Sequence, residues 1–199
     1  MIIIENTPTI ETKRLILRKF TEDDVNDFLE IMSDEEVNTF LPWYTLTSTS
    51  EAREKLQKNY LSYYNKYSAY RYEICLKEDN KPIGYVVLSD SESFDLGYGL
   101  RKEFWHKGII TEATRVVVER IKNMGYAYIT ATHDVNNPRS GKVMKKLGME
   151  YKYSYVEQWQ PKDISVTFRM YQLNFDRNND FTYMEYWNRY NNHFIERDL

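Results

Sequence analysis

One short segment, residues 104–111, combines features that suit the binding of a phosphate group. It connects an expected strand to an expected helix, and the first turn of a helix has unpaired backbone N–H groups at the positive end of the helix dipole. Gly108 lets the backbone approach a ligand because it has no Cβ, and Lys107 adds a positive charge. An ordinary strand-to-helix turn uses the same residues, so this segment alone leaves both interpretations open.

Two residues have side chains that can exchange protons near neutral pH in suitable surroundings. Asp95 lies in a strand whose alternation places it on the same face as Gly97 and Gly99. His133 ends another strand, and an imidazole has its ordinary pKa close to neutrality. Either residue could act as a general base, or be only a paired polar group at a strand end.

The pattern of apolar residues predicts the elements that must position these groups. Expected strands cover residues 15–17, 69–77, 82–90, 93–101, 126–133, 149–160 and 164–175. Expected helices begin at Thr21 and Ser48, run from 108 to 125, and begin again at Ser140 as the N-cap. This order, βαα-βββ-α-β-α-ββ, predicts an α/β fold with a mixed, mostly antiparallel central sheet flanked by helices.

The 199 residues are enough for one domain with a substantial core. We expect residues 1–175 to form this domain and residues 176–199 to form a helical extension packed on it, because no Pro/Gly-rich linker separates them. In the extension, apolar residues spaced by three or four predict a helix over 181–194. Such a helix could cover a cleft, extend the core or mediate a homodimer.

The composition limits the classes of partner. A net charge of −3 gives no general attraction to nucleic acid or to anionic membranes, and no apolar run is long enough to span a bilayer. The single cysteine, Cys75, predicts a reducing compartment and a cytoplasmic location. The histidines are not spaced with carboxylates as metal ligands, so we expect no metal site.

Two segments together carry a family resemblance. The sequences LGYGLRKEFWHKGIITEA, residues 96–113, and HDVNNPRSGKVMKKLGM, residues 133–149, resemble the GNAT acetyltransferases, specifically the branch named for ribosomal-protein N-terminal acetylation. The opening LILRKFTEDDV is also typical of that branch. The resemblance follows the order of elements over about the first 175 residues, and two linked motifs at the expected spacing are more specific than one.

The resemblance implies acetyl-CoA as the acyl donor. The pyrophosphate would lie on the loop around Gly108, held mainly by backbone N–H groups. The strand with Tyr98, Gly99 and Leu100 would run beside the pantetheine arm, which Asn137 would also contact. The implied cofactor-binding residues are Tyr98, Gly99, Leu100, His106, Lys107, Gly108, Ile109, Ile110, Thr111, Asn137 and Ser140.

Three positions depart from the family pattern. Trp105 stands where Arg or Gln is usual, and Ile110 stands where Gly or Ala is usual. Some relatives place a tyrosine general acid seven residues after the Asn, where this chain has Met144, which has no proton to give. Because the phosphate site depends on backbone donors, we expect the first two changes to weaken side-chain contacts and leave the site in place.

The implied activity is transfer of an acetyl group to a primary amine by direct attack in a ternary complex. The candidate catalytic residues are Asp95 and His133 as bases and Ser140, which could protonate the leaving thiolate. The acceptor would be a small molecule or a peptide, and the acidic composition slightly favours a cationic one. Trp43 lies in the loop that borders the acceptor cleft in such folds. The alternative is a non-catalytic module that senses CoA or binds a partner on the same fold.

Overall fold

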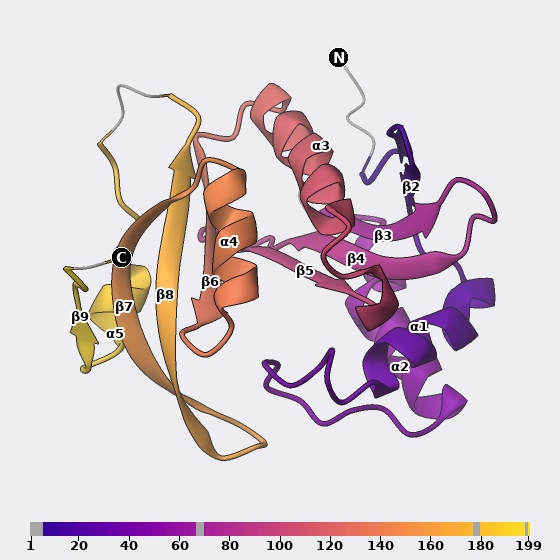
Figure 1. Cartoon of the computed structure of the whole chain (residues 1–199), viewed down its shortest axis with the longest axis horizontal. Coiled ribbons are helices and arrows are strands. Elements are labelled where there is room, and N and C mark those ends of the chain that lie inside the picture. The colour runs from indigo at the N-terminus through magenta and orange to yellow at the C-terminus, as the bar shows by residue number, and fades with distance from the viewer. Residues whose placement is uncertain (1–5, 67–69, 177–179, 198) are drawn as a thin grey trace.

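The computed structural model describes residues 6–66, 70–176, 180–197 and 199. Its strands form two antiparallel sheets (Figure 1). The first sheet contains, in this order, β1 (Ile10–Glu11), β2 (Leu15–Arg18), β3 (Tyr70–Leu76), β4 (Pro82–Leu88) and β5 (Leu96–Leu100). The second sheet has the order β6-β8-β7-β9 and contains β6 (Tyr128–Asp134), β7 (Glu150–Trp159), β8 (Ile164–Asn174) and β9 (His193–Phe194).

The predicted central sheet is therefore split into two parts. Within the described residues, the parts meet at one parallel bridge between Asp95 and Thr130. Each of the two strands at this junction pairs along its length with a neighbour of its own sheet, β5 with β4 and β6 with β8. Beyond the bridge, the facing edges of β5 and β6 separate and leave backbone groups free for a ligand.

Helices cover both faces of the first sheet. The α-helices are α1 (Val25–Ser33), α2 (Thr49–Asn59), α3 (Ile109–Asn123), α4 (Pro138–Lys146) and α5 (Glu185–Arg189), and 3-10 helices span Glu22–Asp24, Leu61–Tyr63 and Lys102–Phe104. Alternation along β4 assigns the faces, since Val86 and Leu88 join the core under α3 whereas Tyr85 joins the core under α1 and α2. α4 lies beside β6 (Figure 1).

The predicted α/β class and element order are confirmed, with the short strands β1 and β9 added. Ser48 starts α2 as predicted, because its hydroxyl accepts the Glu51 N–H at 3.3 Å. The glycine predicted to end α3, Gly125, has the positive φ of a C-cap, 83°. No helix in the described parts of the chain is long and apolar enough to span a bilayer.

The start of α4 differs from the prediction. Asn137, not Ser140, is the N-cap, because its side-chain oxygen accepts the Ser140 N–H at 3.4 Å. Pro138 follows as the first helical residue, a position that suits proline because the missing N–H has no helical partner there. Ser140 therefore lies within the first turn, and its hydroxyl is left for another partner.

The tail also differs from the helix predicted over 181–194. The structure has only the five-residue α5 and the strand β9, which pairs with β7. Tyr183, just before α5, donates its N–H to Gln172 Oε1 at 2.8 Å and accepts at its carbonyl from Tyr153 OH at 2.7 Å. Because side chains of β7 and β8 take these backbone groups, a helix does not begin earlier.

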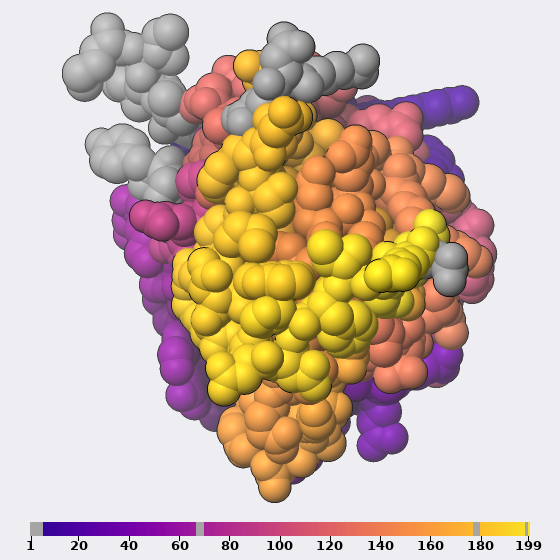
Figure 2. Space-filling model, turned by 90° about the vertical axis from the view of Figure 1, so that its left-hand side faces the viewer, coloured from indigo at the N-terminus to yellow at the C-terminus, as the bar shows by residue number. Residues whose placement is uncertain are grey.

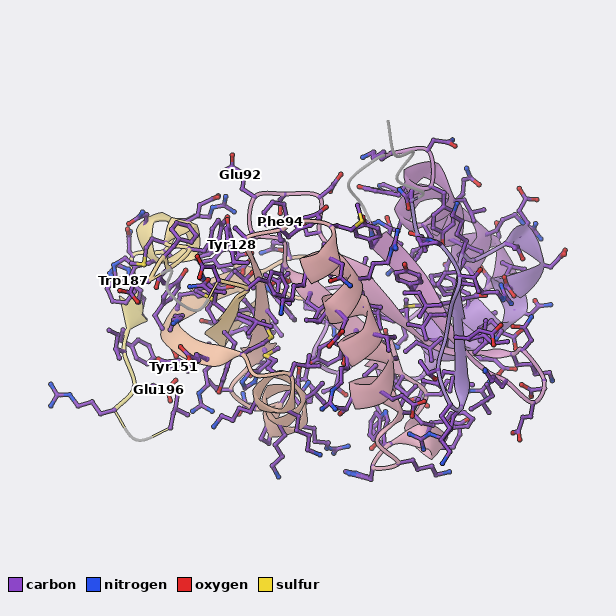
Figure 3. The ribbon with its side chains drawn as sticks, turned by 90° about the horizontal axis from the view of Figure 1, so that it is seen from above. Glu92, Phe94, Tyr128, Tyr151, Trp187 and Glu196 are labelled. Atoms are coloured by element: carbon purple, nitrogen blue, oxygen red, sulfur yellow. The ribbon has the colours of Figure 1, made fainter. Side chains whose placement is uncertain are left out.

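The described part of the tail packs against β7 and β8, and Figure 2 shows it, in yellow, lying over them. Tyr186 of α5 stacks on Tyr155, with ring centroids 5.2 Å apart. Glu196 pairs with Arg169 at 2.6 Å and donates its N–H to Tyr151 OH at 3.0 Å. Figure 3 shows Tyr151 and Glu196 together at this end of the molecule. Aromatic and ionic contacts thus hold the tail in place.

Candidate active site

A cavity of about 360 Å³ opens between the two sheets. Its lining comes from β5, β6, α2, α4 and the loop after α1, and it includes five of the predicted site residues: Asp95, Tyr98, His133, Asn137 and Ser140. A second hollow of about 370 Å³, over α2, contains none of them. The cavity between the sheets is therefore the candidate active site.

The backbone of β5 has one bonded edge and one open edge. Asp95 accepts at its carbonyl from Ser89 N–H at 2.9 Å, and Arg101 donates its N–H to Ile83 at 2.8 Å, so both turn toward β4 and its extensions. Because orientation alternates along a strand, Gly99 must also turn toward β4, where it pairs with Tyr85. The backbone groups of Gly99 are thus used within the sheet, contrary to the prediction that they meet the cofactor.

The open edge of β5 is formed by the remaining residues, Leu96, Tyr98 and Leu100. The Leu100 carbonyl accepts the indole N–H of Trp105 at 2.7 Å. The parallel bridge between Asp95 and Thr130 uses the Leu96 N–H, so the Leu96 carbonyl, both backbone groups of Tyr98 and the Leu100 N–H face the space beside β6. Of the three residues predicted to pair with the pantetheine arm, Tyr98 and Leu100 remain suitable.

The loop before α3 has the geometry of an anion site. His106 and Gly108 have φ values of 61° and 73°, in the left-handed region, and both residues are exposed. The first bond of α3 runs from Glu112 N–H to the Gly108 carbonyl at 3.0 Å. The N–H groups of residues 109–111 precede that bond and have no partner within the helix.

Arg14, on the turn before β2, holds this loop from the other side. Its Nη1 donates to the Lys107 carbonyl at 3.0 Å, and its Nη2 lies 2.6 Å from the Glu112 carboxylate. Glu112 would otherwise oppose an anion at the start of α3, so the ion pair leaves the exposed Lys107 as the nearer charge. Sequence reasoning missed Arg14 because it is distant along the chain.

Trp105 has a structural reason for replacing the Arg or Gln that is usual there. Its indole N–H bonds to the end of β5, and its ring supports the guanidinium of Arg139, whose Cζ lies 4.7 Å from the ring centroid. Arg139 is exposed in the first turn of α4, and its contact with Trp105 places its positive charge next to the loop. This chain therefore has the positive charge on Arg139, whereas an Arg at position 105 would supply it in the usual motif.

Tyr98 and Ser140 form a pair of hydroxyl groups across the cavity from β5 to α4. Tyr98 OH lies 2.9 Å from the Ser140 carbonyl and 3.0 Å from Ser140 Oγ. Burial raises the pKa of the Tyr98 phenol well above its ordinary value, so it stays protonated at neutral pH. Asn137 uses its side-chain oxygen as the cap of α4, which leaves its amide N–H groups for the cavity.

Asp95 is a half-buried carboxylic acid at the junction of the sheets. Its only hydrogen-bond donor among the described side chains is the Thr130 hydroxyl at 3.3 Å, which lies closer, at 2.9 Å, to the Ser93 carbonyl. Burial with so little compensation raises the pKa of Asp95 to about 7. Asp95 can therefore take up and release a proton at neutral pH.

His133 is more enclosed than Asp95. Its Nδ1 bonds to the Asp134 carbonyl at 2.8 Å, which leaves Nε2 as the unprotonated nitrogen. A Cβ added to Gly141 would lie 2.6 Å from Nε2, so the backbone of α4 covers that atom. Burial lowers the pKa of His133, and the residue is only 4% exposed. This geometry suits packing between β6 and α4 better than proton transfer to a substrate.

The end of the cavity near α2 contains residues that sequence reasoning did not assign. Trp43 lies in the lining, as predicted for its loop, together with Lys55, Asn59 and Arg71. For Lys55, Asn59 and Arg71, the sequence offered no evidence beyond their position on a helix and a strand close to that loop. Their convergence depends on the packing of α2 against β3 and β4.

Comparison with known proteins agrees with this geometry. Residues 14–150, more than half of the chain, match the family described as Acetyltransferase (GNAT) domain. The chain belongs to the GNAT acetyltransferases. Two similar Bacillus proteins, both named as uncharacterized N-acetyltransferases, are YnaD of Bacillus subtilis (strain 168), 28% identical over 144 residues, and p20 of Bacillus licheniformis, 28% identical over 148 residues. These alignments cover 70% and 71% of this chain and 81% and 82% of those proteins.

Solved structures show the same fold. A GNAT acetyltransferase from Bacillus anthracis has a TM-score of 0.73 at 22% identity, covering 85% of this chain and 100% of that one. RimL, a ribosomal L7/L12 α-N-protein acetyltransferase solved with coenzyme A, has a TM-score of 0.74 at 19% identity, covering 84% and 98%. The microcin C7 self-immunity acetyltransferase MccE, solved with acetyl-CoA and AMP, has a TM-score of 0.72 at 16% identity, covering 82% and 93%.

This GNAT chain is thus an N-acetyltransferase that moves an acetyl group from acetyl-CoA to an amine. Nothing in the comparisons favours the alternative of a non-catalytic module. The local geometry fits the donor, because the chain has unpaired N–H groups at the start of α3, an open edge on β5 and a cavity between the sheets.

The bond between Trp105 and β5 gives a testable prediction for this GNAT site. We expect Trp105→Phe to raise the Kd for acetyl-CoA about fivefold to thirtyfold, because the bond of the indole N–H to Leu100 holds the loop in its binding conformation. Its loss favours other loop conformations by about 1–2 kcal/mol, which binding must then overcome. Isothermal titration calorimetry measures this. Trp187→Phe, the same substitution in the distant tail, is the control (Figure 3). An equal Kd for both variants would show that the bond does not organise the loop.

Proposed function

We propose that the acetyl group moves by direct attack of a primary amine while donor and acceptor occupy the cavity between β5 and β6 together. The observation that carries this proposal is Asp95, half-buried in the cavity with its pKa raised to about 7 by burial. An amine with an ordinary pKa of about 10 is an ammonium ion at neutral pH and must lose a proton before it attacks. Asp95 can accept that proton, directly or through one water molecule.

The proposed donor site has three parts. The N–H groups at residues 106–111 would bind the pyrophosphate, with Lys107 and Arg139 as exposed cations nearby. The open edge of β5 at Tyr98 and Leu100 would pair with the pantetheine amides. The amide of Asn137 would contact the same arm from α4.

The remaining groups support the bond-breaking step. Acetyl-CoA supplies the acetyl group as a thioester, whose carbonyl oxygen gains negative charge during attack. A backbone N–H on the open edge of β5 can stabilise that charge, an effect of about 3–4 kcal/mol for one well-placed donor. Ser140 Oγ, 3.0 Å from the neutral Tyr98 phenol, can donate a hydrogen bond to the leaving thiolate, since Met144 has no proton to give. The proton that the attacking nitrogen releases as the tetrahedral intermediate collapses can then neutralise the thiolate.

The wider assignments remain predictions. The acceptor is a small molecule or a peptide amine, and the names of the relatives do not decide between them. A cytoplasmic location is expected from the single cysteine, and a homodimer is one of the three roles that the sequence left open for the tail. We also propose that residues 176–199 fold with the main domain, which the pairing of β9 with β7 supports.

Two measurements test the proposed function together. Calorimetry should give saturable binding of acetyl-CoA, and release of free CoA thiol should follow the addition of amines from a panel of amino acids, peptides, polyamines and aminoglycosides. Acetyl-pantetheine, which lacks the pyrophosphate, is the control and should bind far more weakly. Absence of acetyl-CoA binding, or binding with no transfer to any amine, would refute the proposal.

A further inference from the structure

The cavity contains two cations at the end away from the donor loop, Lys55 of α2 and Arg71 of β3. Neither forms a salt bridge with any carboxylate in the parts of the chain that the structure describes. Two partly buried cations without a counter-charge favour an anionic ligand.

Aromatic rings hold both cations in position. Lys55 Nζ lies 3.9 Å from the ring centroid of Trp43, and Arg71 Cζ lies 3.6 Å from that of Tyr63. Burial, with no opposing carboxylate, lowers the pKa of Lys55 to about 8, so the amine still carries its charge for most molecules at neutral pH. The rings restrict the side chains and leave their N–H donors available.

Two buried donors at this end have no acceptor. Arg71 Nε and Trp43 Nε1 are both buried without a hydrogen-bond partner among the described residues. The carboxylates in the cavity lining are those of Asp95, at the sheet junction, and Asp134, which accepts from Asn136 at 2.8 Å. Donors thus accumulate at one end of the cavity, and the proposed base lies elsewhere.

The register of the sheet places Arg71 on the same face as the base, and α2, which carries Lys55, covers that face. Arg71 pairs with Val87, which pairs with Gly97, and Gly97 shares its face with Asp95. Two strand spacings, about 10 Å, therefore separate the backbone of Arg71 from that of Gly97. One small molecule with an amine at one end and an anion at the other can span this separation.

We propose that Lys55 and Arg71 form an anion subsite that selects amine acceptors carrying a carboxylate or a phosphate group. The inference rests on the proposed function, because it names the class of acceptor for the same cavity. It reverses the expectation from net charge that the acceptor is cationic. Net charge describes the whole surface, whereas the acceptor meets only the groups that line the cavity.

Matched pairs of acceptors test the inference. The carboxylate arm compares L-amino acids with their carboxamides, and the phosphate arm compares O-phosphoethanolamine with ethanolamine. We expect kcat/KM to favour the anionic member about tenfold or more in at least one arm, and the preferred arm identifies the anion. The wild-type protein alone gives this result, so the test does not depend on the folding of a variant.

Variants then assign the preference to the two cations. Lys55→Met and Arg71→Met should each lower the ratio of anionic to neutral kcat/KM about tenfold or more, with acetyl-CoA affinity unchanged. The two acceptors of a pair differ in amine pKa, but this difference affects the wild-type protein and the variants equally. It therefore cancels when their ratios are compared. Lys58→Met is the control, since Lys58 is an exposed lysine on the same helix and is absent from the cavity lining.

The outcomes separate this inference from the proposed function. Equal transfer to both members of every pair, transfer to neutral amines alone, or a ratio unaffected by both cavity variants would overturn the anion subsite and leave the acetyltransferase mechanism standing. Transfer to no amine at all would overturn both. A preference for anionic acceptors that falls in the two cavity variants and persists in Lys58→Met supports the subsite.

Discussion

We expect Asp95→Asn to lower kcat by about 10²–10⁴-fold, the usual contribution of a general base. Asn keeps the size of the side chain and can still accept from the Thr130 hydroxyl, but it cannot accept a proton from the amine. In the wild-type protein, activity should rise with pH through about 7 as Asp95 ionises. Steady-state kinetics between pH 5.5 and 9 measures both effects. The rise in activity near pH 7 should be absent from the pH profile of the variant.

The same substitution should stabilise the protein. Folding raises the pKa of Asp95 to about 7, so the folded state holds a proton that the unfolded state releases at lower pH. The contribution of Asp95 to the free energy of unfolding is therefore fully present below about pH 4 and is lost as the pH rises through 7. Asp95→Asn removes that loss, and we expect the free energy of unfolding at pH 8 to increase by about 1–3 kcal/mol, with no gain at pH 4.

Glu92→Gln is the matched control for Asp95→Asn. Glu92 is an exposed carboxylate close by in the same loop, and Figure 3 shows it pointing away from the body of the molecule. The control should keep the wild-type kcat, pH profile and denaturation midpoint. A variant at position 95 that retains kcat and the limb near pH 7 would exclude Asp95 as the base.

Gly108→Val should remove most of the affinity for acetyl-CoA, with a Kd at least about 100-fold higher, the equivalent of two charge-assisted hydrogen bonds. Gly108 has a φ of 73°, and a β-branched residue there either strains the backbone or changes its course, so the N–H groups of the loop no longer converge. The nearest atom to an added Cβ is Arg14 Nη2 at 3.8 Å, so the substitution causes no clash within the fold. Calorimetry with acetyl-CoA measures the effect.

Gly125→Val provides a control with the same backbone strain. Gly125 ends the same helix with a φ of 83° and has no atom within 4 Å of an added Cβ. Both variants should lose similar thermal stability, but only Gly108→Val should lose acetyl-CoA binding. Acetyl-pantetheine should bind the two variants equally. An equal loss of acetyl-CoA affinity in both would mean that general destabilisation, and not the phosphate site, is responsible.

The loop that we propose for the donor has a backbone geometry that the sequence predicts, because that geometry is local. The turn, Gly108 and the first N–H groups of α3 are consecutive in the sequence, and helix geometry alone determines where those groups point. The error at α4 arose where local rules allowed two answers. Asn and Ser are both good caps, and the choice of Asn137 followed from the proline after it.

The tail was predicted incorrectly because spacing is a weak signal when other elements compete for the backbone. Apolar residues three or four apart are compatible with a helix, but Tyr153 and Gln172 take the backbone groups of Tyr183. The free edge of β7 then pairs with β9. These partners are distant along the chain, so no window of local sequence contains the information.

The sequence by itself determined the α/β class, and it predicted the donor loop and two candidate bases, since each depends on consecutive residues or on the alternation of a strand. Only the tertiary structure decided which base is usable, because the pKa of Asp95 depends on its burial at the sheet junction, whereas α4 encloses His133. It also decided the chemistry of the acceptor end. Lys55 and Arg71 lie on different elements, and their unpaired charges meet only when α2 packs over the sheet.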